Sequence, residues 1–339
     1  MPRGIVNPDS NICWLASCVQ VLADIPSFRK ALINHKFDGA TKRNPIPRFL
    51  RTLRNVLLQL QEDDASPINI DSLRAAGHAV QAIYFRPLVH EDSGEHLTQI
   101  MRYVEEAGLE EEICKGFLMS DTLSPRPRSS LTTLNRTADT FDEALRRAMI
   151  CDNTGAKHWI KDPPAVFTFT IVRHHVELNY PFIFNDTFCL DRFMSDRKEE
   201  VDSVNQFSED AEAVLASWND YQYDLRSVVV HRGHSINAGH YFVFRKVPNQ
   251  RDEWYKLDDD RISIKTTNHM LRVARGSYGG TESAAALVYV RRGYEIDDVR
   301  PRRPRRPIRE DSGGEQLEQQ CLLQMLQDDD DCILLQKAI

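Results

Sequence analysis

The sequence predicts an α+β fold, because helical and strand patterns occupy different parts of the chain. Up to about residue 112, apolar residues mostly recur every three or four positions, the spacing of amphipathic helices. From about residue 165, short runs rich in β-branched and aromatic residues follow one another, as in VFTFTIV and AALVYV. The 339 residues suffice for a substantial core. We therefore expect one large domain, with a helical part and a sheet part, followed by a tail.

The first predicted helix covers residues 14–23 and follows an irregular polar stretch, NPDSN. Pro26 closes this helix, and Cys13 falls at its N-terminus. At such a position the helix dipole and the free backbone N–H groups lower the pKa of a thiol and offer donors to an oxyanion. We interpret Cys13 as a candidate nucleophile and Cys18, inside the apolar helix, as a core residue.

Two further helical patterns are clear, at residues 46–61 and 97–104. Asp92 and Glu95 precede the second of them, and as residues of a first helical turn they would complement the helix dipole. The stretch SDTLSPRPRSSLTTLNRTADT, residues 120–140, is polar and rich in turn residues. We predict that it forms a mobile insertion or a substrate-sensing loop, the least ordered part of the domain.

The strand part contains a candidate base and acid. SVVVH, YFVFRKV and WYKLDD have strand composition, and His240 lies between Gly239 and Tyr241 at the start of the second run. Antiparallel pairing with the returning strand would bring Asp258 beside His240. Thiol catalysis needs a thiolate, an imidazole that accepts and returns a proton, and a carboxylate that fixes the imidazole tautomer. Cys13, His240 and Asp258 supply these three groups.

The acidic run at residues 258–260 also has a simpler interpretation, as a solvated turn. Neighbouring strand residues face opposite ways, so Asp258 and Asp259 cannot both face the imidazole. Asp259 is the alternative partner, or it supports the oxyanion region or the histidine loop.

Several motifs together resemble the catalytic domain of ubiquitin-specific proteases. GIVNPDSNICWLASCVQVL resembles the cysteine box of that family, and YDLRSVVVHRGHSINAGHYFVFRKV with EWYKLDDDRIS resembles its histidine box. HEDSGEHLTQIM resembles the family's Gln-Gln-Asp-x-x-Glu-Phe-Leu element, while DPPAVFTFTIVRHH and YGGTESAAALVYVRR resemble later strands. The similarity covers roughly residues 4–292, and the order of the motifs makes it specific.

The resemblance implies a papain-like α+β fold, with a thumb at about residues 1–112 and a palm with fingers at residues 113–294. It implies hydrolysis of the bond after the C-terminal Gly-Gly of ubiquitin, through Cys13, His240 and Asp258. The implied partners are ubiquitin or polyubiquitin conjugates.

The resemblance also implies a set of substrate-binding residues. Asp92, with Glu95 beside it, would meet an arginine of the ubiquitin tail, Leu-Arg-Leu-Arg-Gly-Gly. Gly239 and the backbone around Cys13 would form the narrow passage for Gly-Gly, and Tyr241 is a further implied substrate-binding residue. Without the resemblance, the two acidic residues are explained by the helix dipole alone.

One departure from the family concerns the oxyanion hole. The family has an asparagine five residues before its cysteine, where this chain has Pro8. A one-residue insertion would make Asn7 the donor, with Asn11 as the alternative. Losing one such donor typically costs about 100- to 1000-fold in turnover. Three functions therefore stay open: a deubiquitinase, a deconjugase of a ubiquitin-like modifier with the same Gly-Gly tail, and a weakly active pseudoenzyme that binds ubiquitin.

A second departure concerns zinc. The sequence has no Cys-x-x-Cys pair, and Cys114, Cys151 and Cys189 stand far apart. We predict abbreviated fingers without structural zinc. His231 and His234 do not form a ligand pattern with His240, so we expect no metal and no cofactor.

Composition limits the function classes. A net charge of −7 disfavours nonspecific nucleic-acid binding. The longest apolar stretch, residues 284–290, is far shorter than a membrane span, and the N-terminus has no signal-peptide pattern. Seven cysteines without framework spacing fit a reducing compartment. We expect a cytoplasmic or nuclear protein, or one present in both, that binds neither nucleic acid nor membrane.

The composition changes after Arg292, close to the predicted end of the domain at residue 294. Residues 295–314 contain RPRRPRRPIR, which we interpret as a stiff solvated linker, with nuclear targeting or docking to acidic partners as the alternative. Residues 315–339 form the tail, which we expect to be largely disordered. Its end, DDDDCILLQKAI, resembles the first part of a ubiquitin-interacting motif and would bind a second ubiquitin. The alternative is a helix that packs on the domain or on a partner.

Overall fold

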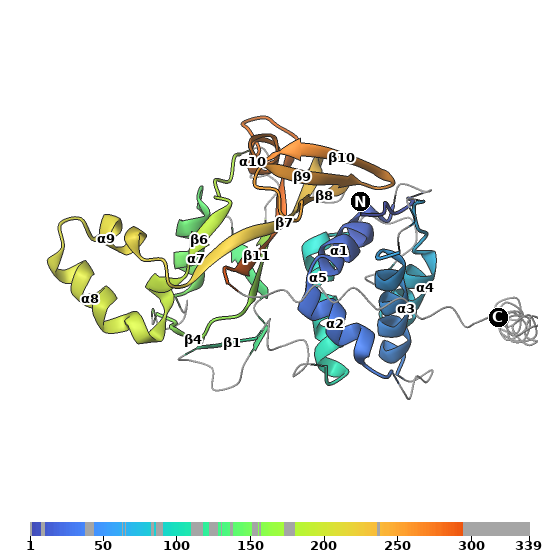
Figure 1. Cartoon of the computed structure of the whole chain (residues 1–339), viewed down its shortest axis with the longest axis horizontal. Helices are drawn as coiled ribbons and strands as arrows, with labels where there is room; N and C mark the ends of the chain where they lie inside the picture. Colours follow the sequence, from blue (N-terminus) through green and yellow to red (C-terminus); the bar gives the residue numbers. More distant parts are fainter. Residues whose placement is uncertain are drawn as a thin grey trace, which may run out of the picture. The chain divides into compact units, whose positions relative to one another are not determined.

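Helices occupy the first part of the domain and strands the later part, as the sequence predicts (Figure 1). The computed structural model describes residues 2–7, 11–37, 44–62, 64, 66–82, 85, 91–109, 118–121, 128–129, 131–135, 138–150, 155, 157–172, 180–235 and 238–293. All of them belong to one compact unit, Met1–Asp297. Pro8, Cys114, Cys151, the predicted linker and the predicted tail helix lie outside the described residues.

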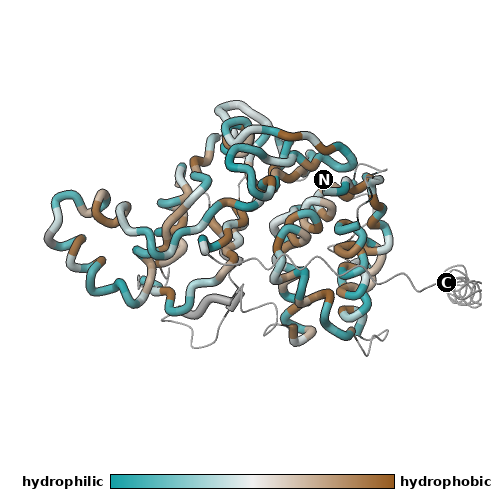
Figure 2. The backbone as a smooth tube through the Cα atoms, viewed as in Figure 1, coloured by the Kyte–Doolittle hydropathy of each residue, from teal (hydrophilic) through white to brown (hydrophobic). Residues whose placement is uncertain are grey.

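The helical part contains five helices among the described residues. They are α1 (Cys13–Ala23), α2 (Pro26–Asn34), α3 (Ile46–Gln59), α4 (Asp71–Val80) and α5 (Ser93–Glu106). The first, third and fifth coincide with the three predicted helices, although α5 begins earlier than its apolar pattern, directly after Asp92. In Figure 2, polar and apolar residues alternate along these helices, as expected where one face of each is buried.

The sheet part is one large, mostly antiparallel sheet. Its strands are β3 (Leu131–Asn135), β5 (Val166–Val172), β6 (Thr187–Cys189), β7 (Gln222–Ser235), β8 (Ala238–Lys246), β9 (Glu253–Asp258), β10 (Arg261–Thr266) and β11 (Glu282–Arg291). Their order is β10-β9-β8-β7-β11-β5-β3, with β6 paired to β7. The pairing of β3 with β5 is parallel. Separate helices and an antiparallel sheet make the fold α+β, which confirms the predicted class.

Both faces of the central strands of this sheet are buried. Along β8, Tyr241 and Val243 pack into a core shared with the helical part, whereas Phe242 and Phe244 pack into a second core on the opposite face. Helix α1 contacts β8 and is buried along its whole length. The helix that begins with Cys13 is therefore fixed against the strand that carries His240.

The predicted loop at residues 120–140 is wrong in part. The structure places β2 (Arg128–Ser129) and β3 inside it, and a small sheet with the order β2-β1-β4 uses β1 (Leu118–Asp121) and β4 (Ile160–Asp162). Polar composition masked these strands, because edge strands need no alternating apolar residues and threonine favours extended backbone. The remaining residues of that stretch, and much of the predicted fingers, lie outside the described part of the chain.

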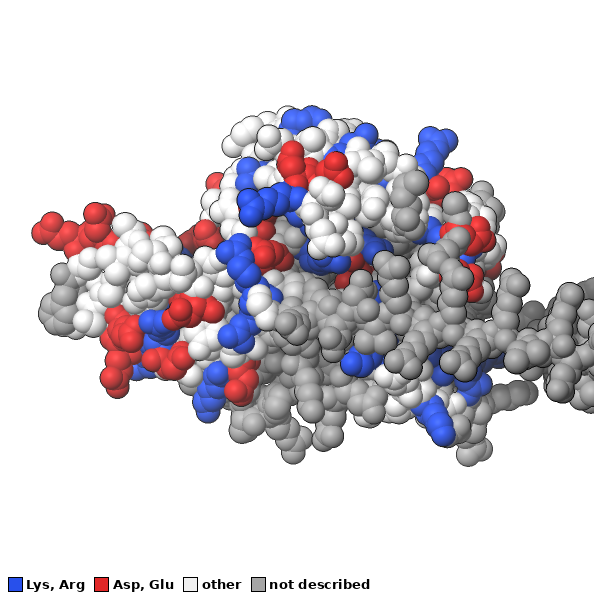
Figure 3. All heavy atoms as spheres, viewed as in Figure 1, with Lys and Arg blue, Asp and Glu red and all other residues white. Residues whose placement is uncertain are grey.

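Helices in the later part of the chain were not predicted. They are α7 (Phe141–Ala148), α8 (Lys198–Phe207), α9 (Ala211–Ser217) and α10 (Thr267–Arg275), with short 3₁₀ turns η3 (Asp191–Phe193) and η4 (Ser195–Arg197) before α8. Figure 3 shows acidic side chains gathered where α8 and α9 lie, and Glu199, Glu200, Asp202, Glu209 and Asp210 are exposed there. No helix within the described residues is both long and apolar enough to span a bilayer.

Candidate active site

Cys13 is the first residue of α1 and is completely buried. The residue before it, Ile12, donates its backbone N–H to the Asn7 side-chain oxygen at 3.1 Å. Asn7 therefore holds the start of the helix in place, although it lies six positions earlier in the chain. A hydrogen bond joins the Cys13 thiol to His240, so the two residues that sequence analysis paired are in contact.

His240 connects the thiol to a carboxylate. Its Nε2 lies 2.5 Å from Asp258 Oδ1, which leaves Nδ1 as the ring nitrogen for Cys13. The pKa of His240 is raised from 6.5 to about 10, first by the hydrogen bond with Asp258 and then by that with Cys13, while burial opposes the rise. At neutral pH the imidazole is therefore protonated, and its charge favours a thiolate on Cys13.

Asp258 is held as an anion. Burial works to raise its pKa, but hydrogen bonds from His240 and Lys256 outweigh burial and leave the pKa below its usual value of 3.8. Lys256 Nζ lies 2.9 Å from Asp258 Oδ2. Asp258 thus has a different donor on each oxygen, which fixes the orientation of the carboxylate.

Asp259 lies farther from the imidazole and contacts Asn7 instead. Its Oδ2 is 3.9 Å from His240 Nε2, whereas the Asn7 amide nitrogen donates to both of its oxygens at 3.1 and 3.2 Å. The backbone of Asp259 is left-handed, with φ of 55°, in the tight turn between β9 and β10. Burial raises the pKa of its carboxyl group. The two aspartates therefore do different things, one facing His240 and the other orienting Asn7.

The N-terminal segment is pinned to this turn. Ile5 donates its backbone N–H to the Asp259 carbonyl at 3.0 Å. A Cβ atom at Gly4 would lie only 2.7 Å from the Asp260 Cα atom, so a larger residue would push the segment away. Asn11, the alternative oxyanion donor, is half-buried two residues before Cys13. Both predicted asparagines therefore flank the start of α1.

The predicted substrate-binding residues have partners within the chain. Asp92 caps α5, with one oxygen accepting from the Glu95 backbone N–H at 2.8 Å and the other from the Tyr241 hydroxyl at 3.1 Å. Tyr241 is only 2% exposed and thus links α5 to β8. Glu95 is exposed. A Cβ atom at Gly239 would lie 2.4 Å from His231 Nε2, so the glycine is needed for close packing of β7 against β8.

Sequence analysis missed two cations near Asp258. Besides Lys256, the Arg232 guanidinium lies 4.0 Å from Asp258 Oδ2 and pairs with Glu282 at 2.7 Å. A signal for Lys256 was present, because residues two apart on a strand share a face. The position of Arg232 could not be predicted, because it depends on the register of β7 against β8, which places Arg232 opposite His240.

Two other cysteines have unreactive surroundings. Cys18 donates to the Ser93 carbonyl, and burial raises its pKa well above the usual value, as expected of a core residue. Burial, with a hydrogen bond to Asp191, raises the pKa of Cys189 to about 12. Neither thiol is ionised near neutral pH, in contrast to the environment of Cys13.

Three side chains could in principle hold a metal ion. Within the described residues, His240, Asp258 and Asp259 offer ligand atoms that lie within 4.8 Å of one another. Hydrogen bonds among these groups and from Asn7 and Lys256 already account for their arrangement. An acid–base site explains the cluster, and the expectation that the protein uses no metal stays a prediction.

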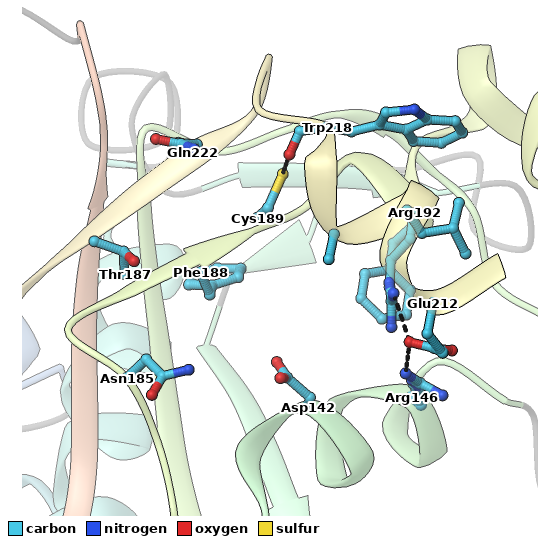
Figure 4. Close-up of a pocket in the computed structure, with 13 residues that line it drawn as sticks. Asp142, Arg146, Asn185, Thr187, Phe188, Cys189, Arg192, Glu212, Trp218 and Gln222 are labelled. Atoms are coloured by element: carbon cyan, nitrogen blue, oxygen red, sulfur yellow. Dashed lines mark hydrogen bonds and ion pairs between the residues drawn. The ribbon is translucent and has the colours of Figure 1, made fainter. Parts of the chain in front are cut away.

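A pocket of about 290 Å³ lies elsewhere, between α7, β6, η3 and α9 (Figure 4). Glu212 points between Arg146 and Arg192 and accepts from them at 2.7 and 3.0 Å. Cys13, His240 and Asp258 are not among the residues that line it. The pocket is therefore separate from the candidate site.

Comparisons with known proteins agree with the motifs. The family model described as ubiquitin carboxyl-terminal hydrolase matches residues 3–289. Ubiquitin carboxyl-terminal hydrolase 15 of Saccharomyces cerevisiae is 30% identical over 37% of this chain and 11% of its own length. Ubiquitin C-terminal hydrolase 12 of Arabidopsis thaliana is 42% identical over 18% of this chain and 5% of its own. Ubiquitin carboxyl-terminal hydrolase 48 of Gallus gallus is 40% identical over 21% of this chain and 8% of its own length. The matches thus span only a small part of each of these relatives.

Proposed function

The chain belongs to the ubiquitin carboxyl-terminal hydrolase family, and we propose that it is a cysteine-type deubiquitinase that hydrolyses the isopeptide or peptide bond after the C-terminal Gly-Gly of ubiquitin. The observation that carries the proposal is the line of hydrogen bonds from buried Cys13 through His240 to Asp258. Such a line activates a thiol and keeps a proton ready for a leaving amine.

The proposed reaction has two halves. The Cys13 thiolate attacks the carbonyl carbon of the last glycine and forms a tetrahedral oxyanion. As the C–N bond breaks, the His240 imidazolium gives its proton to the departing amine, and a thioester remains. His240 then takes a proton from water, whose oxygen attacks the thioester, and the proton returns to the departing sulfur. Ubiquitin leaves as a carboxylic acid, which loses its proton to solvent, and Asp258 keeps the ring aligned throughout.

The oxyanion would be stabilised at the start of α1. Backbone N–H groups in the first turn of a helix have no partner within the helix and carry partial positive charge. Asn7 supplies an amide beside them, but that amide donates to Asp259 in the present structure. As an oxyanion donor, Asn7 would have to share its amide N–H groups between the oxyanion and the Asp259 carboxylate. Asn11 is the alternative donor.

The ubiquitin tail would approach α5 and β8. Its arginines need carboxylate partners, and Glu95 is exposed at the first turn of α5. Asp92 is also exposed, but it already accepts two hydrogen bonds, so an incoming arginine would have to share its oxygens. We propose that Asp92 and Glu95 together receive the arginines of the tail.

The test is labelling with ubiquitin that carries a C-terminal electrophile, followed by mass spectrometry. We expect one adduct on Cys13 and none on the Cys13→Ala variant, which should still bind ubiquitin in a titration. Labelling by probes of ubiquitin-like modifiers, but not by ubiquitin, would replace the proposal with a deconjugase. Ubiquitin binding without any adduct would indicate the pseudoenzyme suggested by the engaged Asn7 amide.

A further inference from the structure

The second oxygen of Asp258 has a dedicated partner. Lys256 and Asp258 lie two residues apart on β9, so their side chains leave the same face of the sheet. Lys256 Nζ lies 2.9 Å from Oδ2, and His240 Nε2 lies 2.5 Å from Oδ1. The lysine and aspartate side chains are 18% and 23% exposed. An ion pair this well covered is weakly screened by salt and well ordered.

An aromatic ring supports both ends of this arrangement. Lys256 Nζ lies 4.2 Å from the centre of the Phe242 ring, and the His240 imidazole stacks on the same ring at 6.5 Å with an interplanar angle of 27°. Phe242 is 1% exposed and belongs to the core of that face. The ammonium group is therefore held by a carboxylate and by an aromatic ring that is itself packed in the core.

Arg232 does not make an equivalent ion pair with Asp258. Its guanidinium also lies over the Phe242 ring, at 5.0 Å, but it is 4.0 Å from Asp258 Oδ2. Its shorter ion pair, at 2.7 Å, is with Glu282. Removal of Lys256 would thus leave Asp258 Oδ2 without a close cation.

We propose that Lys256 is a positioning residue, which holds the Asp258 carboxylate against His240 and so keeps the imidazole aimed at Cys13. The inference rests on the proposed function of these three residues in thiol catalysis. The ammonium group of Lys256 pairs with Asp258, and the proposal is that it acts on His240 through this carboxylate.

A pH profile separates positioning from a simple charge effect. Asp258 and Cys13 are hydrogen-bonded to His240, Asp259 lies 3.9 Å from it, and Lys256 and Arg232 are the nearby cations. If Lys256 acted by its charge alone, its removal would favour the imidazolium and move the alkaline limit of activity to higher pH. If it positions Asp258, its removal lets the carboxylate rotate away from Nε2, and the alkaline limit moves to lower pH.

The experiment compares Lys256→Met, Lys256→Arg and Lys246→Met in the full chain. Lys246 is a matched control, because its ammonium group also lies over an aromatic ring, that of Trp254 at 4.8 Å, but donates to a backbone carbonyl. Turnover of a fluorogenic ubiquitin amide and alkylation of Cys13 by iodoacetamide are measured from about pH 6 to about pH 10. Melting temperatures show whether each variant is folded.

We expect Lys256→Met to lower kcat about tenfold with KM unchanged, the loss typical of one charge-assisted hydrogen bond. The alkaline limit of turnover should move down, and the pH above which Cys13 is alkylated should move up, because a misaligned imidazolium stabilises the thiolate less. Lys256→Arg should recover to within about threefold, and Lys246→Met should match the parent. If Lys256→Met does not fold, Lys256→Gln serves as the second uncharged variant.

Two results would overturn the inference: activity of the uncharged variant within about twofold of the parent, or an alkaline limit that moves up. An arginine variant as impaired as the methionine variant would also count against it, since that outcome indicates a packing role. The alkylation assay needs no ubiquitin. A parent protein that fails to cleave ubiquitin but shows the expected alkylation shifts would refute the proposed function while supporting the role of Lys256.

Discussion

Replacement of Asp258 by alanine should reduce activity by an amount that depends on pH. The hydrogen bond with Asp258 is the largest cause of the rise in the His240 pKa from 6.5 to about 10. If the variant returned fully to 6.5, the imidazolium fraction at about pH 8 would fall from nearly one to about 3%, a loss of about thirtyfold. At about pH 6 the imidazolium would still be about three-quarters populated, so protonation alone would cost less than about twofold. Cys13 also raises the pKa, which makes the thirtyfold figure an upper bound.

The assay is kcat/KM for a fluorogenic ubiquitin amide across that pH range, with Asp259→Ala as the matched control. Asp259 lies 3.9 Å from His240 Nε2 but binds the Asn7 amide, and it is the last in order of the causes that raise the His240 pKa. Its removal should therefore lower kcat/KM with much less dependence on pH. Loss of orientation will add a pH-independent factor to the Asp258→Ala variant. The reasoning fails if the ratio of parent to Asp258→Ala activity is the same at both ends of the range.

Three further predictions concern stability. His96 is fully buried, and burial lowers its pKa from 6.5 to about 3. Because the unfolded state binds the proton first, stability should fall as pH drops below about 6.5, by about 2 kcal/mol at about pH 5. In urea titrations His96→Phe, which keeps a ring beside Trp14, should remove that slope, and an unchanged slope would exclude His96 as its source. Asp24, 2% exposed, accepts from Ser227 at 2.9 Å and pairs with Arg226 and Arg245 at 3.1 and 2.7 Å. Asp24→Asn should cost about 3 kcal/mol in the same titrations, and a loss under about 1 kcal/mol would contradict a buried ion-pair tie. Gly239→Ala should lower the melting temperature, because the added Cβ would lie 2.5 Å from the Arg232 carbonyl. Gly280→Ala should lower it less, because its Cβ would meet the Ser277 hydroxyl, which can rotate away. Equal losses in both glycine variants would refute this account.

Much of the fold could be predicted because its signals are local. Apolar periodicity located α1, α3 and α5, and branched residues located β5, β7, β8 and β11. The strands β2 and β3 and the helix α8 were missed, because their sequences are largely polar and their positions depend on partners far along the chain. Only the register of β3 against β5 explains why the run LTTLN is a strand.

The candidate site was predictable to the extent that its chemistry follows from strand pairing. Asp258 could be placed near His240 because a hairpin connects their strands, and the distance of 2.5 Å agrees with that expectation. The oxyanion region was one of the places expected for Asp259, but its bond to Asn7, 252 positions away in the chain, depends on the tertiary fold. The occupied oxygens of Asp92 could not be foreseen, because the hydroxyl that binds one of them belongs to another part of the domain.

The distribution of charge around His240 has one consequence for how the site works. Asp258 faces two cations, Lys256 and the imidazolium, and its low pKa reflects both. Asp259, one residue later, faces an amide, and burial raises its pKa. Two adjacent carboxylates would repel each other if both faced the imidazole. The left-handed turn at Asp259 separates them, so one carboxylate can hold the proton-transfer ring while its neighbour orients the amide beside the thiol. A substitution that straightened this turn would therefore disturb His240 and Asn7 together, which neither aspartate variant alone can do.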